Sequence, residues 1–288
     1  QGVAVVFISH RMDEVRELCD RATVFRDGKD VGTVDVATAP DGEIVRMMIG
    51  RPLREVFPPR PPRPEPPAPL LEVRNLGWGR SLREVSFTLH RGEILGLSGL
   101  EGQGQGDLLF ALFGVYAGVS GEVRLDGNPV APVGARGAMN AGFALAPEDR
   151  KTQGLILPLP VGENITLSTL PAVSRLGLVD PPLEDAATGR MREALAIKTA
   201  SMDVPVRFLS GGNQQKVALA KWLLTGAEVF LLHDPTRGID VGAKGEIYAL
   251  MRRLAAEGKG ILFFSTDLAE IVGLCDRALH HAGRERPA

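Results

Sequence analysis

The segment that decides the fold is 209–215, Leu-Ser-Gly-Gly-Asn-Gln-Gln, a polar turn directly before a helical pattern. The residues that follow place Val217, Ala220 and Leu224 on one helix face. Ser210 is suited to cap this helix, and the two glycines would let a phosphate approach the free N–H groups at its positive end. By itself the pattern favours an ordinary capped helix, so the rest of the chain has to decide.

The composition is that of a packed globular protein. Of 288 residues, 44% are hydrophobic and 24% are charged. Lys and Arg number 33 against 35 Asp and Glu, a net charge of −2, which argues against intrinsic disorder and against nucleic-acid binding through bulk positive charge. Two cysteines cannot form a disulfide framework, which favours a reducing compartment. No apolar run approaches the roughly 20 residues that span a bilayer.

A repeat divides the chain. Residues 2–22 align without a gap with residues 258–278, at an offset of 256 residues, and both copies contain Leu-Cys-Asp-Arg-Ala. Each copy reads as an apolar strand, a turn and a helix, and the matched cysteines read as packing residues. We therefore expect two copies of one domain, the first represented only by its last ~50 residues, with about 200 residues preceding them. The absence of an initiator Met agrees with a piece of a longer protein.

Three segments follow from this repeat. Residues 1–50 are expected to be the end of a first domain and residues 70–288 a second domain. Between them, residues 51–69 are expected to be an extended linker, since nine of the eighteen residues 52–69 are proline. A ligand for a proline-recognition domain is the alternative for this segment. Within the second domain, residues of about 155–208 are less regular and are expected to form an inserted helical subdomain.

Strand patterns after residue 70 predict an α/β fold. LLEVRNL and EVSFTLH alternate as antiparallel strands do, whereas EILGLS and EVFLLH are continuous apolar runs typical of buried parallel strands. The run EILGLS leads into Gly99-Leu-Glu-Gly-Gln-Gly-Gln-Gly106 and then a helix, which is the context of a phosphate-binding P-loop. The loop departs from that motif, because Gln105 stands at the lysine position and Gly106 at the Ser/Thr position. Asp107 would add repulsion, and a tight turn without nucleotide is the alternative.

Three segments together resemble the ATPases of ABC transporters. LSGGNQQKVALAKWLL resembles the signature motif of bacterial importers with two fused nucleotide-binding domains, and PEDRKTQGL at 147–155 and DPTRGIDVGAKGEIY at 234–248 resemble the second domain of that group. Such proteins import monosaccharides such as ribose, xylose or galactose, and some relatives import nucleosides. The resemblance implies an α/β P-loop NTPase cassette with a mixed parallel core sheet, an antiparallel β subdomain and a helical subdomain. ATP and Mg²⁺ are the implied cofactors.

The resemblance also implies site residues. The signature motif is Leu209, Ser210, Gly211, Gly212, Asn213 and Gln214. The nucleotide-binding positions are Gly99, Gly102, Gly104, Gln105, Gly106, Glu148 and Trp78. Glu148 stands at the Q-loop position, and Trp78 is either an adenine-stacking residue or a packing residue. The catalytic glutamate of the family falls on Asp234, and its Mg²⁺-associated Asp falls on His233, a poor magnesium ligand.

The histidine switch distinguishes the two copies of the repeat. His10 occupies the position of the histidine that contacts the γ-phosphate, whereas its repeat partner is Thr266. Asp240 matches the D-loop, which crosses between domains. Residues 162–164 resemble the part of the helical subdomain that receives the coupling helix of the membrane subunit.

ABC domains pair head to tail, so the resemblance implies one competent site, built from His10, Leu209–Asn213 and a P-loop that lies outside this chain. The site of the second domain is expected to be degenerate, and the isolated chain to hydrolyse ATP slowly or not at all. Implied partners are integral-membrane permease subunits, a periplasmic or surface substrate-binding protein and the preceding cassette, with no nucleic acid. The implied location is peripheral, on the cytoplasmic face of the cell membrane.

Other readings stay open at this point. One is a nucleoside importer of the same group. Another is a twin-cassette protein acting in translation or DNA repair, although such proteins lack the EDRK and TRGID segments. A third is a non-catalytic regulatory module that binds partners through the signature face.

Overall fold

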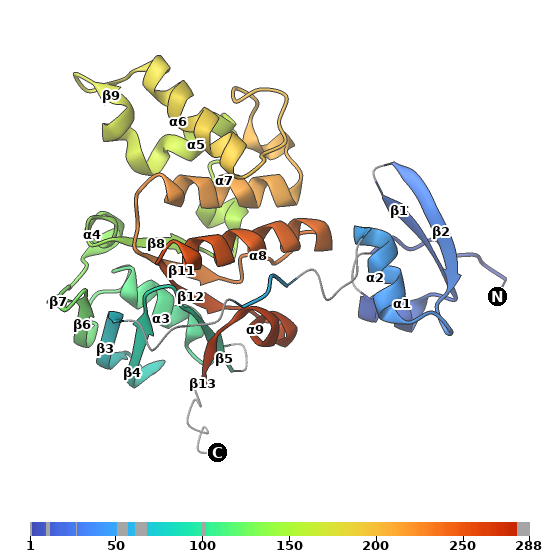
Figure 1. Ribbon diagram of the computed structural model, residues 1–288, viewed down its shortest axis with the longest axis horizontal. Helices are drawn as coiled ribbons and strands as arrows, with labels where there is room; N and C mark the ends of the chain where they lie inside the picture. The colour runs from blue at the N-terminus through green and yellow to red at the C-terminus, as the bar shows by residue number, and fades with distance from the viewer. Residues whose placement is uncertain are drawn as a thin grey trace.

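The computed structural model describes residues 2–9, 12–26, 28–50, 57–60, 68–99 and 102–280. Within these residues the chain forms a small N-terminal unit and a larger α/β unit with its own core (Figure 1). His10, the expected switch residue, lies outside the described residues. No helix of the described part is long and apolar enough to cross a membrane.

The N-terminal unit contains α1 (Met12–Leu18), the hairpin β1 (Arg21–Arg26) and β2 (Lys29–Asp35), and α2 (Asp41–Ile49). Val24, Ala39 and Ile44 form its small core. The expected strand at its start is wrong, because residues 2–9 pair with no described strand. A strand needs a neighbour to satisfy its N–H and C=O groups, so the apolar pattern alone cannot produce one.

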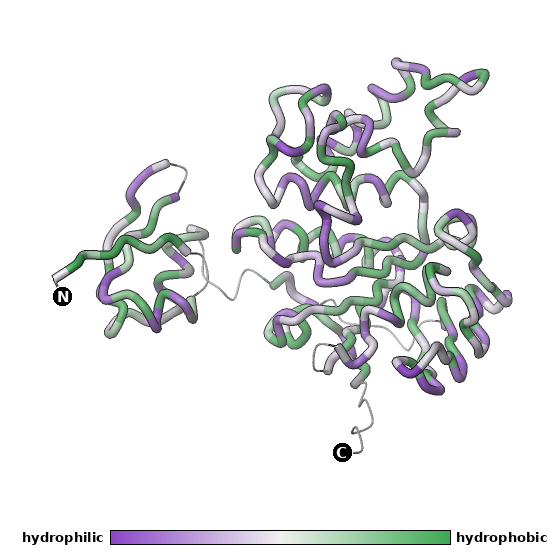
Figure 2. Tube along the Cα trace, turned by 180° about the vertical axis from the view of Figure 1, so that it is seen from behind, coloured by the Kyte–Doolittle hydropathy of each residue, from purple (hydrophilic) through white to green (hydrophobic). Residues whose placement is uncertain are grey.

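Five parallel strands form the core sheet of the larger unit, in the order β13-β5-β12-β11-β8. These strands are β5 (Ile94–Ser98), β8 (Phe143–Ala146), β11 (Val229–His233), β12 (Gly260–Phe264) and β13 (Arg277–His280). The apolar runs in β5 and β11 are buried, as the sequence pattern predicts. Figure 2 shows the hydrophobic colour running along the interior of this unit.

An antiparallel sheet lies beside the core sheet, with strands in the order β4-β3-β6-β7. Its strands are β3 (Pro69–Trp78), β4 (Leu82–His90), β6 (Ser120–Leu125) and β7 (Asn128–Pro129). The antiparallel pairing predicted for the first two is confirmed. Buried leucines of β3 and β4 join the same hydrophobic core as the parallel sheet.

Helices pack around the two sheets (Figure 1). They are α3 (Gln105–Leu112), α4 (Gly134–Asn140), α8 (Val241–Ala256) and α9 (Leu268–Leu274). A π-helical turn, Arg150–Gly154, follows β8 and begins with the last two residues of the EDRK segment. Arg150 joins this turn to the loop after β11, and Gly154 joins it to α7.

The region expected to be helical has that character. It contains α5 (Val161–Thr166), a 3-10 segment Leu167–Val173, α6 (Pro181–Ala194) and the 3-10 turn Val206–Phe208. A two-residue hairpin, β9 (Ser174–Arg175) with β10 (Leu178–Val179), interrupts it. The helix α7 (Gly211–Leu223) follows and packs against α5 and α8, so it joins this region to the core.

Candidate functional site

The glycine-rich loop joins β5 to α3, the placement expected of a P-loop. Gly104 ends the loop in a left-handed conformation, with φ of 100°, and α3 begins at Gln105. The side chain of Gln105 is buried, 3% exposed, at the position where a P-loop carries its lysine. Gly104 thus provides the left-handed turn before α3, but Gln105 offers no positive charge at the lysine position.

His233, at the end of β11, lies directly against Gly106. A Cβ atom added to Gly106 would lie 2.7 Å from Cε1 of the His233 ring. The imidazole thus fills the space in which a P-loop Ser or Thr would hold Mg²⁺, and its ring nitrogens are poor ligands for that metal. The imidazole of His233 and the missing hydroxyl at Gly106 therefore do not fit Mg²⁺.

Asp234, which follows β11, holds its carboxylate toward the switch position. The Thr266 hydroxyl donates to Asp234 Oδ2 at 2.7 Å. Burial raises the pKa of the Asp234 carboxyl above its ordinary value, while the bond from Thr266 acts in the opposite direction. The Asp234 carboxylate is therefore held by the hydroxyl at the switch position.

Glu148 lies at the same site, between the imidazole of His233 and the guanidinium group of Arg237. Its Oε2 lies 3.7 Å from His233 Nε2, and its Oε1 forms an ion pair with Arg237. The Q-loop position is thus engaged by side chains of its own cassette.

Trp78 stacks face to face on Tyr116, with ring centroids 3.8 Å apart and planes 6° from parallel. Its indole N–H donates to the carbonyl of Ala117 at 3.2 Å, and the Tyr116 hydroxyl donates to Asp107 at 2.9 Å. Burial and the bond to Asp107 raise the pKa of Tyr116 to about 12, so the phenol stays protonated. Tyr116 therefore covers one face of Trp78, the residue for which adenine stacking and packing were the two alternatives.

The space that remains is small. A cavity of about 240 Å³ lies between the loop and β11, lined by Gly102, Gly104, Gln105, Gly106, Asp107, Glu148, His233 and Phe264. This is below the usual volume of a pocket for a small-molecule ligand. The structure brings these predicted positions together, but with a histidine in the metal position and an added carboxylate.

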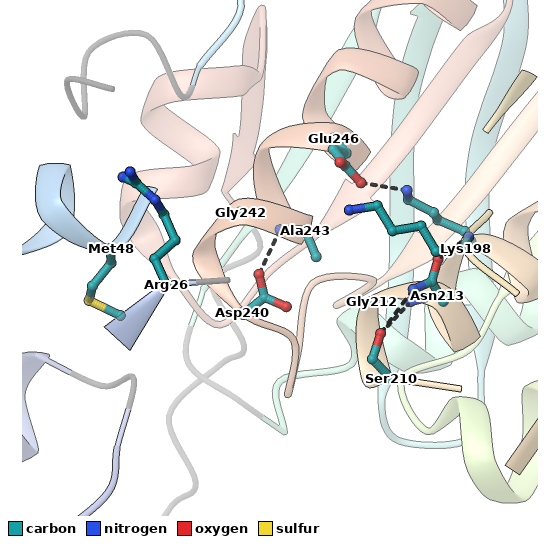
Figure 3. A pocket seen from close by; sticks show the side chains of 11 residues that line it. Arg26, Met48, Lys198, Ser210, Gly212, Asn213, Asp240, Gly242, Ala243 and Glu246 are labelled. Carbon is teal, nitrogen blue, oxygen red and sulfur yellow. Dashed lines mark hydrogen bonds and ion pairs between the residues drawn. The ribbon is translucent and has the colours of Figure 1, made fainter. Parts of the chain in front are cut away.

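Residues of the signature segment and of α8 line a second, larger pocket of about 340 Å³, together with Arg26 and Met48 of the N-terminal unit (Figure 3). Ser210 caps α7, accepting from the Asn213 backbone N–H at 3.5 Å and from its side-chain amide at 3.0 Å. Asn213 in turn accepts from the backbone N–H of Lys198 at 2.8 Å. Polar groups at the N-terminus of α7 therefore line an open cavity, the arrangement that binds anions.

The two signature glycines permit close packing on either side. A Cβ at Gly211 would lie 2.9 Å from the Arg150 guanidinium, and one at Gly212 would lie 2.5 Å from the Ala243 methyl group. Asp240, the D-loop position, caps α8 by accepting from Ala243 N–H at 2.9 Å (Figure 3). The ends of α7 and α8 thus meet at the signature pocket.

Leu209 and Gln214 lie outside this pocket lining. Leu209 packs against the hydrophobic core, and the buried Gln214 donates to the Val206 carbonyl at 3.3 Å. Both act as packing residues that fix the turn before α7.

Several residues that shape the two pockets escaped sequence reasoning. Lys198 and the ion pair between Lys216 and Glu246, at 2.5 Å, line the signature pocket. Glu246 is an exposed residue of α8, and nothing in the sequence spacing indicates its partner Lys216. Tyr116 could have been suspected from its place just after α3, whereas its stacking on Trp78 requires the folded chain.

Comparisons with known proteins agree with this geometry. A parallel core sheet, a glycine-rich loop after β5 and a Ser-Gly-Gly turn at the start of α7 define a nucleotide-binding ATPase cassette. The chain belongs to the ABC transporter family, whose model matches residues 82–237.

The chain is similar to curated proteins and to solved structures. The chain is 50% identical over 283 residues to the ribose import ATP-binding protein RbsA 1 of Mesorhizobium japonicum, covering 97% of this chain and 55% of that protein. It is 47% identical over 278 residues to RbsA of Pseudomonas putida, covering 96% and 54%. The chain thus spans about half the length of these relatives. A nucleotide-free ATP-binding cassette superposes with a TM-score of 0.65 at 19% identity, covering 75% of this chain and 88% of the other, which shows the fold.

Proposed function

We propose that the chain is the second half of a twin-cassette ATPase that drives import of a sugar, ribose in the first instance, through a membrane permease. The observation that carries the proposal is the contrast between the two pockets. The signature pocket is open and polar, whereas the cassette's own P-loop is filled by His233. The relatives of similar sequence are ribose import ATP-binding proteins about twice as long.

Two features of the N-terminal unit support the proposal that another cassette precedes it. Residues 4–8 correspond in the repeat to β12, the central strand whose side chains are buried on both faces. In this chain Val6 and Ile8 are each 93% exposed, so the segment lacks the two strands that cover its counterpart. Ser9 Oγ also donates to Glu14 at 2.7 Å, as Ser265 donates to Glu270 at 2.7 Å. The end of a first cassette accounts for both observations.

At the competent site this chain supplies the signature side. The Ser210 hydroxyl and the N–H groups at the start of α7 would bind phosphate oxygens of ATP held by the P-loop of the first cassette. Bound ATP with Mg²⁺ supplies the phosphoanhydride bond whose hydrolysis resets the closed pair of domains. His10 would contact the γ-phosphate from the first cassette, and Asp240 would cross the interface.

Partners and location follow from the same proposal. Permease subunits would contact the helical region around residues 162–164, and a substrate-binding protein would deliver the sugar on the opposite side of the membrane. The ATPase would therefore be peripheral, on the cytoplasmic face.

The test uses the complete twin-cassette protein with its permease in vesicles. Ser210→Asp keeps an acceptor at the N-cap of α7 but places a carboxylate in the signature pocket, and it is expected to lower ATP hydrolysis and ribose uptake at least about a hundredfold. His233→Ala, in the filled site, is the matched control and is expected to change both rates less than about twofold. Equal losses in the two variants would overturn the assignment of the competent site. Uptake of a nucleoside and not of ribose would show that the proposed substrate is wrong.

A further inference from the structure

The segments PEDRK, residues 147–151, and TRGID, residues 236–240, meet at one place beside the signature motif. Glu148 forms an ion pair with Arg237, and Arg150 donates to the backbone carbonyls of Arg237 and Gly238 at 2.9 and 3.2 Å. We call Glu148, Arg150, Arg237 and Gly238 the loop junction. Each segment supplies a cation to the other, so neither loop can move far without the other.

Arg150 lies at the centre of the junction. It is 8% exposed, and burial lowers the pKa of its guanidinium group, although arginine remains charged at any physiological pH. Nη1 and Nη2 of Arg150 donate to the two carbonyls, whereas its buried Nε has no hydrogen-bond partner among the described residues. These two bonds offset part of the cost of burying the charge and hold the loop 237–238 against the turn that carries Arg150.

The signature motif rests on the same junction. A Cβ at Gly211 would lie 2.9 Å from Arg150 Nη2 and 3.1 Å from the Gly238 carbonyl oxygen, so the first signature glycine packs against both loops. Further along α7, the Lys221 ammonium group donates to the Gly154 carbonyl at 2.7 Å. The π-helical turn Arg150–Gly154 is thus attached to α7 at two places.

The D-loop position continues from the junction. Asp240 follows Gly238 by two residues and caps α8, whose Ala243 lies against Gly212. The Q-loop position, the D-loop position and the signature turn therefore share one set of contacts within a single cassette.

We propose that Glu148, Arg150 and Arg237 are positioning residues that fix the signature turn and Asp240 to the Q-loop position. A displacement of the Q-loop is passed through the Arg150 hydrogen bonds to Gly238, and through packing to Gly211, without passing through nucleotide in the filled site. This junction explains the shared presence of the EDRK and TRGID segments in a cassette whose own site does not fit Mg²⁺.

The first experiment uses the 288-residue chain and measures amide hydrogen exchange. Arg150→Gln is expected to raise exchange at least about tenfold at the first turns of α7 and α8, by allowing these ends to open locally. Arg237→Gln, at a half-exposed side chain, removes only the ion pair, is expected to fold normally, and should give a smaller rise at the same amides. Arg175→Gln, which breaks the exposed ion pair with Asp180, is the matched control and should change neither turn. A rise confined to residues 150–154 would overturn the proposal.

The second experiment rests on the proposed function and uses the complete protein with its permease. Wild-type protein must first show permease-stimulated ATP hydrolysis; if it does not, the proposed function fails, and the exchange result still decides the junction. Glu148→Arg and Arg237→Glu are each expected to lower the ratio of stimulated to unstimulated hydrolysis about fivefold or more, and the double charge swap to restore at least half of it. Single variants that leave this ratio unchanged, or a swap that restores nothing while the melting temperature recovers, would overturn the positioning role.

Discussion

Lys221 is a buried lysine whose pKa is shifted by its surroundings. Its side chain lies on α7, 7% exposed, with its ammonium group on the Gly154 carbonyl. Burial lowers the pKa of this ammonium group from 10.5 to about 8. In the unfolded chain the pKa returns to its ordinary value, so between these two values the unfolded state binds more protons than the folded state.

This difference predicts an unusual pH dependence. Because the unfolded state binds more protons in that window, the contribution of Lys221 to the free energy of unfolding rises as the pH rises from about 8 toward 10.5. Relative to Lys221→Met, the wild-type chain should gain roughly 2 kcal/mol between about pH 7.5 and about pH 9.5. Urea unfolding of both proteins at the two pH values checks this. A parallel pH dependence of the two proteins would contradict it.

Glu270 is the second buried charge with a measurable role. It is 1% exposed on α9 and accepts from four side chains: Thr236, Lys244, Tyr248 and Ser265. Glu270→Gln removes the negative charge that pairs with Lys244, and it places an amide N–H₂ group where hydroxyl groups now donate to a carboxylate oxygen. The expected loss is about 2 to 4 kcal/mol in the free energy of unfolding, measured by chemical denaturation. Glu257→Gln, at an exposed position after α8, should lose less than about 0.5 kcal/mol.

At the scale of elements, the contact between α7 and α8 depends on the absence of a side chain. Gly212→Ala would bring its Cβ to 2.5 Å from the Ala243 Cβ and separate the two helix ends. We expect a loss of about 1 to 3 kcal/mol in the free energy of unfolding. Adding Ala243→Gly removes the clash and should recover most of this loss, a coupling that a thermal unfolding cycle measures. An additive double variant would contradict the packing argument.

How far elements can be predicted depends on their neighbours. The sequence pattern predicted the correct strand types for β5, β11, β3 and β4. A strand buried on both faces is a continuous apolar run, whereas a strand buried on one face alternates apolar and polar residues. Residues 2–9 have the same apolar pattern and form no strand, since pairing depends on other strands. The hairpin of β9 and β10 is too short for any periodic signal.

At the scale of the whole molecule, the two units have separate cores, and Phe57 belongs to the larger one. Its ring stacks on Tyr248 with centroids 5.1 Å apart and lies against Gly273, while Arg60 donates to the Val272 carbonyl. The short stretch 57–60 of the proline-rich segment is therefore part of the cassette's packing. Among the described residues, the fully buried members of the cassette core begin at Leu70, in β3.

Truncation tests this division. A chain that begins at residue 57 should melt within a few degrees of the 288-residue chain, because the N-terminal core is separate. A chain that begins at residue 68 loses the Phe57 contacts and should be less stable by about 2 to 3 kcal/mol. Calorimetry on the three chains decides. Loss of cooperative melting in the longer truncated chain would show that the N-terminal unit stabilises the cassette.

The sequence identified which positions of the P-loop site depart from the family, since Gln105, Gly106 and His233 stand at readable motif positions. The sequence could not show that two of these residues are in contact, because Gly106 and His233 lie more than a hundred positions apart. The same holds for Arg150 against Gly211 and for Tyr116 on Trp78. Motif positions follow from local spacing, whereas their compensating contacts follow from the tertiary fold.

The contact between Gly106 and His233 also makes loss of this site easier in evolution than its recovery. A serine at 106 would place its Cβ 2.7 Å from the histidine ring, so recovering the hydroxyl first meets a steric barrier. A descendant that regained the site would have to replace His233 before Gly106, and each intermediate would still lack the lysine at position 105. Decay of such a site is therefore easier than its reversal, and lineages that entered this state would tend to keep it.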